Sequence, residues 1–248
     1  MEVHAHTHTA RKKWTHYFWE FLMLFLAVFC GFLAENQREH MVEHQREKQY
    51  MASLLSDLSA DTATLSSGVP LKLRRIGAID SVFVFFNEHP GAKTISGQLF
   101  RTIRRTNFDA RFIRNVITIN QLKNAGGMRL VRNKQIADSI SSYDQRCEVT
   151  ILYNDYYVEN SLVGNRQFEK LFNASDLLPL YIANKNGAII ANIPDSLTIR
   201  INTMDLNEVL NFMVLEKAYA RQEIDRYFEI KERAIRLMEL IKKEYHLK

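Results

Sequence analysis

The sequence predicts a mainly α-helical protein in which one N-terminal transmembrane helix continues into a stalk and then into a bundle-like helical domain with a long C-terminal helix. Glycine and proline are sparse, at 9 and 4 of 248 residues. Apolar residues recur at intervals of three and four, which is typical of amphipathic helices. The expected parts are a cytoplasmic tail at 1–13, a transmembrane anchor at 14–34, a polar helical stalk at 35–50 and a helical domain at 51–248.

The run from Trp14 to Ala34 predicts an uncleaved signal anchor. Its 21 residues would form about 31 Å of helix and carry one charged side chain, Glu20. Bulky Phe32 stands where signal peptidase needs a small residue. Three basic residues at 11–13 flank the N-terminal end, so the positive-inside rule favours a cytoplasmic N-terminus. When Lys and Arg are counted over twenty residues on each side of the anchor, the N-terminal side no longer has more of them. We therefore expect a single-pass bacterial inner-membrane protein whose main domain is extracytoplasmic.

One face of this anchor carries small residues. Ala27 and Gly31 form a small-x-x-x-small pair that lets two backbones approach closely. We therefore expect a homo-oligomer that associates through the face formed by Glu20, Ala27, Gly31 and Ala34. Glu20 can have a function as a carboxylate within the membrane. The alternative is a local His16–Glu20 pair near the membrane–water interface, because Glu20 lies four residues after His16.

Capping and turn residues predict the remaining elements. Residues 66–70, Ser-Ser-Gly-Val-Pro, predict the end of the first helix, and Asn186-Gly187 between two apolar triplets predicts a small hairpin. The last helix carries a heptad pattern that can pack within the domain or pair two chains, and its wide apolar stripe favours packing within the domain. The other expected helices cover residues 71–87, 95–105, 118–126, 133–172 with a possible interruption at 164, and 205–245, and Asn133 is the expected N-cap of the fourth of these.

A metal-binding string lies in the stalk. His40-Met-Val-Glu43-His44 matches the H-x-x-E-H signature of one group of zinc peptidases, and Glu47 lies on the same stripe as a third ligand. A peptidase also needs a pocket around its metal, whereas this string lies on a polar helix near the membrane. A metal-dependent hydrolase that uses His40, His44 and Glu47 is therefore a remote alternative, and no cofactor is expected.

No other motif points to catalysis. The sequence contains no Gly-rich phosphate loop, no G-x-S-x-G and no C-x-x-C. Cys30 lies in the apolar run and Cys147 in a predicted helix, so we expect no disulfide between them and interpret Cys147 as a buried small residue. We expect a protein that is not an enzyme.

Basic residues are concentrated in one part of the domain. Residues 71–134 contain 13 Lys and Arg against 3 Asp and Glu, whereas residues 135–209 contain 5 against 10. The basic block at 101–114 can bind anionic lipid or polymer, and nucleic acid is excluded if the domain is extracytoplasmic. The alternative is that these arginines pair with the acidic block. The anion-binding candidates are Arg101, Arg104, Arg105, Arg111 and Arg114.

Two stretches resemble a known family. They are EFLMLFLAVFCGFLAENQREHMVEHQREKQYMASLLSDLSADT at 20–62 and QLKNAGGMRLVRNKQIADSISSYD at 121–144. These stretches are similar to a family of uncharacterised single-pass bacterial membrane proteins. In that family an anchor runs into a charged helix that ends in Leu-x-x-Asp-Leu, and a Leu-Lys-x-x-Gly motif precedes a long helix. The resemblance covers about a quarter of the chain. It implies an anchor and a helical domain and supplies no catalytic residues. The resemblance therefore supports the topology and not the function. From the anchor, the helical domain and the lack of a catalytic motif we expect an interaction or scaffold protein of the cell envelope, whose partner is an envelope protein or anionic lipid.

Overall fold

The computed structural model describes residues 14–106, 111–124, 126–178, 193–199 and 203–247. The predicted mainly α-helical class is confirmed, with six α-helices among the described residues. The chain divides into two compact units, Met1–Tyr50 and Met51–Lys248. The hairpin predicted around Asn186-Gly187 lies outside the described residues.

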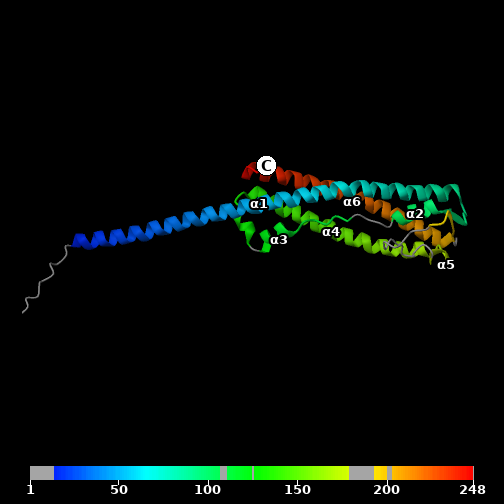
Figure 1. Ribbon diagram of the computed structural model, residues 1–248, viewed down its shortest axis with the longest axis horizontal. Helices are drawn as coiled ribbons and strands as arrows, with labels where there is room; N and C mark the ends of the chain where they lie inside the picture. Colours follow the sequence, from blue (N-terminus) through cyan, green and yellow to red (C-terminus); the bar gives the residue numbers. More distant parts are fainter. Residues whose placement is uncertain (1–13, 107–110, 125, 179–192, 200–202, 248) are drawn as a thin grey trace, which may run out of the picture. The chain divides into compact units, whose positions relative to one another are not determined.

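Helix α1, Trp14–Glu88, contains the apolar stretch of the first unit (Figure 1). Among the residues that the structure describes, α1 alone has a stretch long and apolar enough to cross a membrane, and that stretch is not buried. The side chains that follow it, at 35–42, are polar or exposed. Residues 14–50, the described part of the first unit, are thus one stretch of helix, and its apolar window is not buried by protein.

The predicted helix end at residues 66–70 is wrong, because α1 continues through Pro70. The hydroxyl groups of Ser66 and Ser67 donate to carbonyl groups of the same helix, at 2.6 and 2.9 Å, instead of forming a turn. Gly68 serves packing: a Cβ there would lie 2.9 Å from the Tyr227 ring. Tertiary contacts thus outweigh the local preference of this segment for a helix end.

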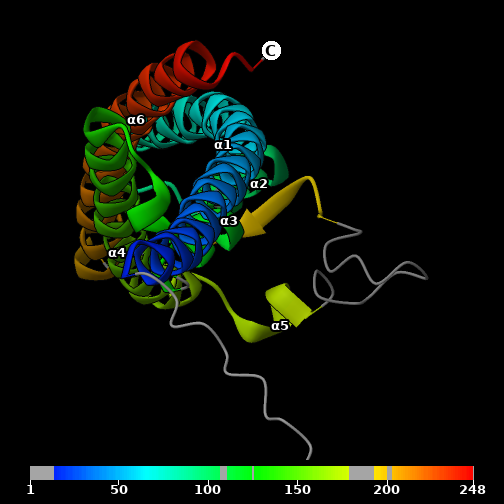
Figure 2. The same cartoon turned by 90° about the vertical axis from the view of Figure 1, so that its left-hand side faces the viewer.

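Three long helices build the second unit. They are residues 51–88 of α1, α4 at Lys134–Glu169 and α6 at Thr203–Tyr245. They run lengthwise beside one another, and the end view in Figure 2 shows them around a common interior. Buried side chains of α6 recur at intervals of three and four within this unit, which fits a core helix. They include Met213, Ala220, Tyr227, Ala234 and Ile241.

The start of α4 has the predicted cap. Asn133 accepts hydrogen bonds through Oδ1 from the backbone nitrogens of Gln135 and Ile136, at 3.0 and 3.3 Å. The possible interruption at Gly164 does not occur, since α4 runs unbroken to Glu169. The Phe212 ring occupies the space that a Cβ at Gly164 would need. Gly164 therefore allows α6 to approach α4 closely.

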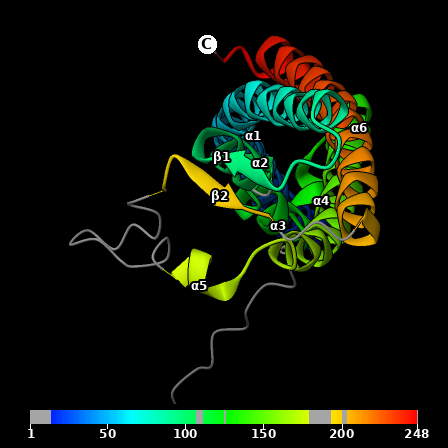
Figure 3. The same ribbon diagram turned by 90° about the vertical axis from the view of Figure 1, so that its right-hand side faces the viewer.

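Short elements complete one end of the unit (Figure 3). Strand β1, Thr94–Ser96, pairs antiparallel with β2, Ser196–Thr198, and α2 follows at Gly97–Thr106. An apolar core lies here, in which the Phe100 ring packs on Phe168 and Phe172 at centroid distances of 5.9 and 5.3 Å. Two other short elements are the 3-10 turn η1 at Gly127–Leu130 and α5 at Ala174–Leu177. Helix α3, Ile117–Asn124, lies toward the opposite end of the long helices from α2 and α5 (Figure 1).

Candidate functional site

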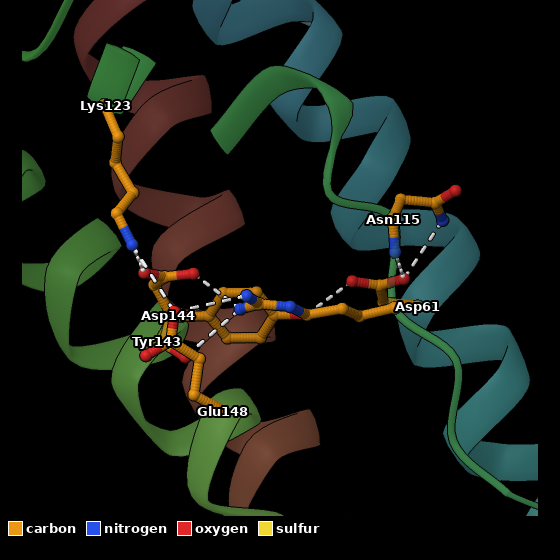
Figure 4. Close-up of polar contacts among 7 residues, drawn as sticks. Asp61, Asn115, Lys123, Tyr143, Asp144 and Glu148 are labelled. Carbon is orange, nitrogen blue, oxygen red and sulfur yellow. Dashed lines mark hydrogen bonds and ion pairs between the residues drawn. The ribbon is translucent and has the colours of Figure 1, made fainter. Parts of the chain in front are cut away.

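A polar network with a buried centre joins α1, α3 with the segment before it, and α4 (Figure 4). Its first centre is Asp61, which is buried on α1. The Asp61 carboxylate accepts hydrogen bonds from the Tyr143 hydroxyl at 2.6 Å and from the backbone and side-chain nitrogens of Asn115 at 2.8 and 3.0 Å. Asp61 therefore fastens both α4 and the segment around residue 115 to α1.

The second centre of the network is Asp144 on α4. Its Oδ1 lies 2.5 Å from Nη1 of Arg114, and its Oδ2 lies 2.8 Å from Nζ of Lys123. Glu148, one turn later, lies 3.5 and 3.4 Å from the same two cations. We call the seven residues Asp61, Arg114, Asn115, Lys123, Tyr143, Asp144 and Glu148 the Asp61–Asp144 network.

Burial and hydrogen bonding shift the pKa values of this network. Burial raises the pKa of Asp61, while the bonds from Tyr143 and Asn115 act in the opposite direction. Burial lowers the pKa of Arg114, but the hydrogen bond and charge of Asp144 more than reverse this and leave it raised. The hydrogen bond from Lys123 to Asp144 raises the pKa of Lys123. The ionised forms of both cations are therefore stabilised.

Cys147 lies beside this network and is buried. Burial raises the pKa of its thiol to about 11, and the nearby Tyr143 and Arg114 only partly oppose the rise. Since the thiolate is the reactive form, this environment makes Cys147 a poor nucleophile near neutral pH. The arrangement suits the structural joining of three segments better than nucleophilic chemistry.

A second polar layer lies between α1 and α6. Lys72 and Glu223 form an ion pair at 2.8 Å, and Arg75 pairs with Glu216. Nζ of Lys72 also lies 5.0 Å from the centre of the Tyr227 ring. The sequence signal for this layer was the position of its charges: residues 65, 72, 75, 79 and 82 share one stripe of α1, so two cations interrupt an otherwise apolar face.

The structure does not present the five candidate arginines as one exposed patch. Arg114 is buried in the Asp61–Asp144 network, and Arg104 lies 3.9 Å from Glu169. Arg101 and Arg111 are exposed, and the side chain of Arg105 lies outside the described part. The arginines whose contacts are described thus meet acidic residues of the 135–209 block.

The histidines of the stalk each lie near a glutamate of the same helix. Nδ1 of His44 lies 3.2 Å from Oε2 of Glu47, and Nδ1 of His40 lies 3.9 Å from Oε2 of Glu43. No group of three or more His, Cys, Asp or Glu side chains within the described ranges is arranged to hold a metal ion. His40, His44 and Glu47 are thus not brought together as a ligand set.

The small-residue face of the apolar stretch is open. Ala27, Gly31 and Ala34 are exposed, and a Cβ at Gly31 would meet nothing within 4 Å. Glu20 lies 3.1 Å from Nε2 of His16, which is the predicted local pair. This face has the room that close approach of a second helix requires.

Comparison with protein-family models, with curated proteins and with solved structures finds no match to this chain.

Proposed function

We propose that this chain is a single-pass protein of the bacterial inner membrane, with a cytoplasmic N-terminus, that presents its helical domain outside the cytoplasm as a non-enzymatic interaction or scaffold module. The observation that carries the proposal is the continuity of α1, which contains both the apolar stretch and the first long helix of the domain without a loop between them. A membrane anchor that continues as one of the long helices of the domain is part of the fold of that domain.

The interior of the domain supports a scaffold role. Asp61, Arg114 and Asp144 of the Asp61–Asp144 network and both ion pairs of the α1–α6 layer have buried side chains that are bonded to polar partners inside the domain. Buried polar groups that satisfy each other favour one arrangement of helices over others. A domain of this kind offers a defined surface to a partner, while its candidate reactive group, Cys147, is buried.

A topology assay tests the membrane part of this proposal. Reporters that are active only in the periplasm or only in the cytoplasm are fused after Lys248. We expect periplasmic activity together with carbonate-resistant membrane association. Cytoplasmic activity would reverse the orientation, and recovery of the chain in the soluble fraction would refute the anchor.

Self-association through the anchor has a separate test. Gly31→Leu combined with Ala27→Leu fills the small-residue face, so crosslinked dimers in membranes should fall several-fold. Phe29→Leu, which changes an apolar side chain about 200° away around the helix, is the matched control. Equal crosslinking of the unsubstituted protein, the double variant and the Phe29→Leu control would contradict association through this face.

A second candidate function is binding of anionic lipid or polymer, which the exposure of Arg101 and Arg111 favours. Arg101→Gln with Arg111→Gln should weaken sedimentation with anionic vesicles and flatten its salt dependence. Arg129→Gln, at another exposed arginine, is the control. Unchanged vesicle binding by the double variant would reject this function.

A further inference from the structure

The segment at residues 111–124, which includes α3, is held on α1 by acidic side chains. Asp61 accepts hydrogen bonds from the backbone and side-chain nitrogens of Asn115, at 2.8 and 3.0 Å. Asp57, one turn earlier on α1, accepts from the backbone nitrogen of Thr118 at 3.3 Å. We call this contact region the 111–124 junction. The protonation of its carboxyl groups therefore affects how firmly the segment is held.

Asp61 is buried in this junction without a cationic partner. The residue is 1% exposed, and its three hydrogen-bond donors, which are the Tyr143 hydroxyl and the two nitrogens of Asn115, are all neutral (Figure 4). Among the residues that the structure describes, no Lys, Arg or His forms an ion pair with Asp61. Burial disfavours the ionised form of a carboxyl group, and here no cation offsets that cost.

The ionisable groups around Asp61 come from α1, from the segment with α3, and from α4. They are Asp57 on α1, Arg114 and Lys123 on the segment and α3, and Tyr143, Asp144, Cys147 and Glu148 on α4. Asp144 and Glu148 already share both cations, at distances of 2.5 to 3.5 Å. The charge of Asp57 directly opposes ionisation of Asp61. Within the described ranges no group of α6 bonds to Asp61 or shifts its pKa.

Tyr143 allows Asp61 to hold a proton without losing a hydrogen bond. A tyrosine hydroxyl both donates and accepts. It now donates to Oδ2 of Asp61 at 2.6 Å. When Oδ2 carries a proton, Oδ2 donates to the hydroxyl oxygen instead, while Oδ1 still accepts from both nitrogens of Asn115. The hydroxyl proton of Tyr143 then has the sulfur of Cys147, one turn later on α4, as a weak acceptor.

We propose that the 111–124 junction is acid-sensitive: a proton shared by Asp61 and Tyr143 tightens the attachment of the segment to α1 and α4, and loss of that proton loosens it. The proposal concerns regulation built into the fold and does not depend on membrane orientation. Its geometric basis is a buried carboxyl group that has neutral donors, a neighbouring carboxylate and a hydroxyl able to reverse its hydrogen bond.

The direction of the pH dependence follows from the burial of Asp61. Burial raises the pKa of Asp61 and Asp57 adds to the rise, while the bonds from Tyr143 and Asn115 oppose it without cancelling it. The folded domain therefore binds this proton at a pH at which an exposed aspartate has released it. The stability from this group is complete below the ordinary pKa of 3.8 and is lost as the pH rises through the folded pKa.

Asp61→Asn tests the proposal because asparagine imitates the protonated carboxyl group. Its Oδ1 can accept from both nitrogens of Asn115 and its Nδ2 can donate to the Tyr143 hydroxyl, so three hydrogen bonds persist without the charge. Asp80→Asn is the matched control on α1, because Asp80 is half exposed and pairs with Lys217. Hydrogen exchange of the full chain in detergent, followed by mass spectrometry of peptides from 111–124, measures local opening of the segment.

After correction for the intrinsic exchange rate, protection of 111–124 should rise by at least about threefold between pH 7.5 and pH 5. Asp61→Asn should show the protection of the acidic form at both pH values, and Asp80→Asn should behave as the unsubstituted protein. Protection that falls or stays level on acidification would overturn the proposal. Lower protection in Asp61→Asn than in the unsubstituted protein at pH 7.5 would also overturn it, since the ionised carboxylate would then be the form that holds the segment.

A second measurement does not require the variant to fold. Carbon-13 NMR of the unsubstituted chain, labelled at the aspartate carboxyl carbons, follows each carboxyl group during an acid titration. One resonance should titrate with a midpoint above the ordinary 3.8. Titration of every aspartate at or below that value would refute a proton held by Asp61.

Discussion

Lys72 of α1 and Glu223 of α6 form an ion pair at 2.8 Å with both side chains fully buried. The carboxylate is also within 2.8 Å of the Asn154 amide nitrogen, in the amide orientation that satisfies both polar atoms of that side chain. Residues 151 positions apart in the chain thus meet in the interior. Such a pair fixes the register of α1 against α6, because any slip would leave two charges buried without partners.

Replacing one member of this pair should destabilise the domain more than replacing both. Lys72→Met or Glu223→Met alone leaves one buried charge, with an expected loss of about 3–5 kcal/mol. The double variant replaces both charges with apolar groups of similar length and should recover most of that loss. Denaturant unfolding of the full chain in detergent, followed by circular dichroism, measures the free energies. A double variant whose loss equals the sum of the two single losses would contradict the buried pair.

Two helical glycines should respond oppositely to alanine. A Cβ at Gly77 would meet nothing within 4 Å, so Gly77→Ala should stabilise α1 by about 0.5–1 kcal/mol. At Gly164 the Phe212 ring occupies the Cβ position, so Gly164→Ala should cost about 1–3 kcal/mol through displacement of that ring. Thermal unfolding of both variants provides the comparison, and Phe212→Leu in the Gly164→Ala background should restore part of the loss. Equal shifts at the two glycines would show that α4 and α6 are farther apart than described.

Helical periodicity predicted the fold class and the end of the last helix at Tyr245, and the residue type of Asn133 predicted the cap of α4. These features depend on local patterns of three to four residues, which a sequence displays directly. The predicted end at 66–70 failed because the outcome depends on Tyr227, which packs on Gly68 from a distant part of the chain. A local turn signal contains no information about that contact.

The candidate sites show the same limit. A cation on an apolar stripe, such as Lys72, can extend to solvent or pair inside, and the sequence does not identify its partner. Arg114 belongs to the basic block in sequence but is bonded to Asp144 in the structure. Charge counts therefore located a basic segment without indicating which of its guanidinium groups face outward.

The two cations that share Asp144 should differ in their effect on stability. The Arg114 side chain is 8% exposed, whereas that of Lys123 is 48% exposed. Arg114→Met removes a buried hydrogen-bonded partner from a carboxylate that Lys123 still pairs, and should cost about 1.5–3 kcal/mol. Lys123→Met should cost at most about 1 kcal/mol, because water reaches that pair. Urea unfolding at low and high salt measures both, and similar losses for the two variants would contradict the inward orientation of Arg114.

The Cys147 thiol should make the domain less stable in alkaline solution. Burial raises its pKa from the ordinary 9.0 to about 11. The unfolded thiol loses its proton near pH 9 and the folded thiol near pH 11, so the folded state binds more protons in this window. Stability from this group is therefore full below pH 9 and falls as the pH rises, by about 2–3 kcal/mol at pH 11.

The measurement compares unfolding free energies at pH 8 and pH 10.5 in a Cys30→Ser background, with and without Cys147→Ala. The protein that retains Cys147 should lose more stability over this interval, since tyrosines and lysines titrate in both proteins and cancel in the difference. Iodoacetamide should modify Cys147 slowly at pH 8 and faster as denaturant is added, because the buried thiol reacts only after opening. Fast modification of the native protein at pH 8, or identical pH dependence in the two proteins, would mean that the thiol is accessible to water and that α4 does not pack against the rest of the domain as described.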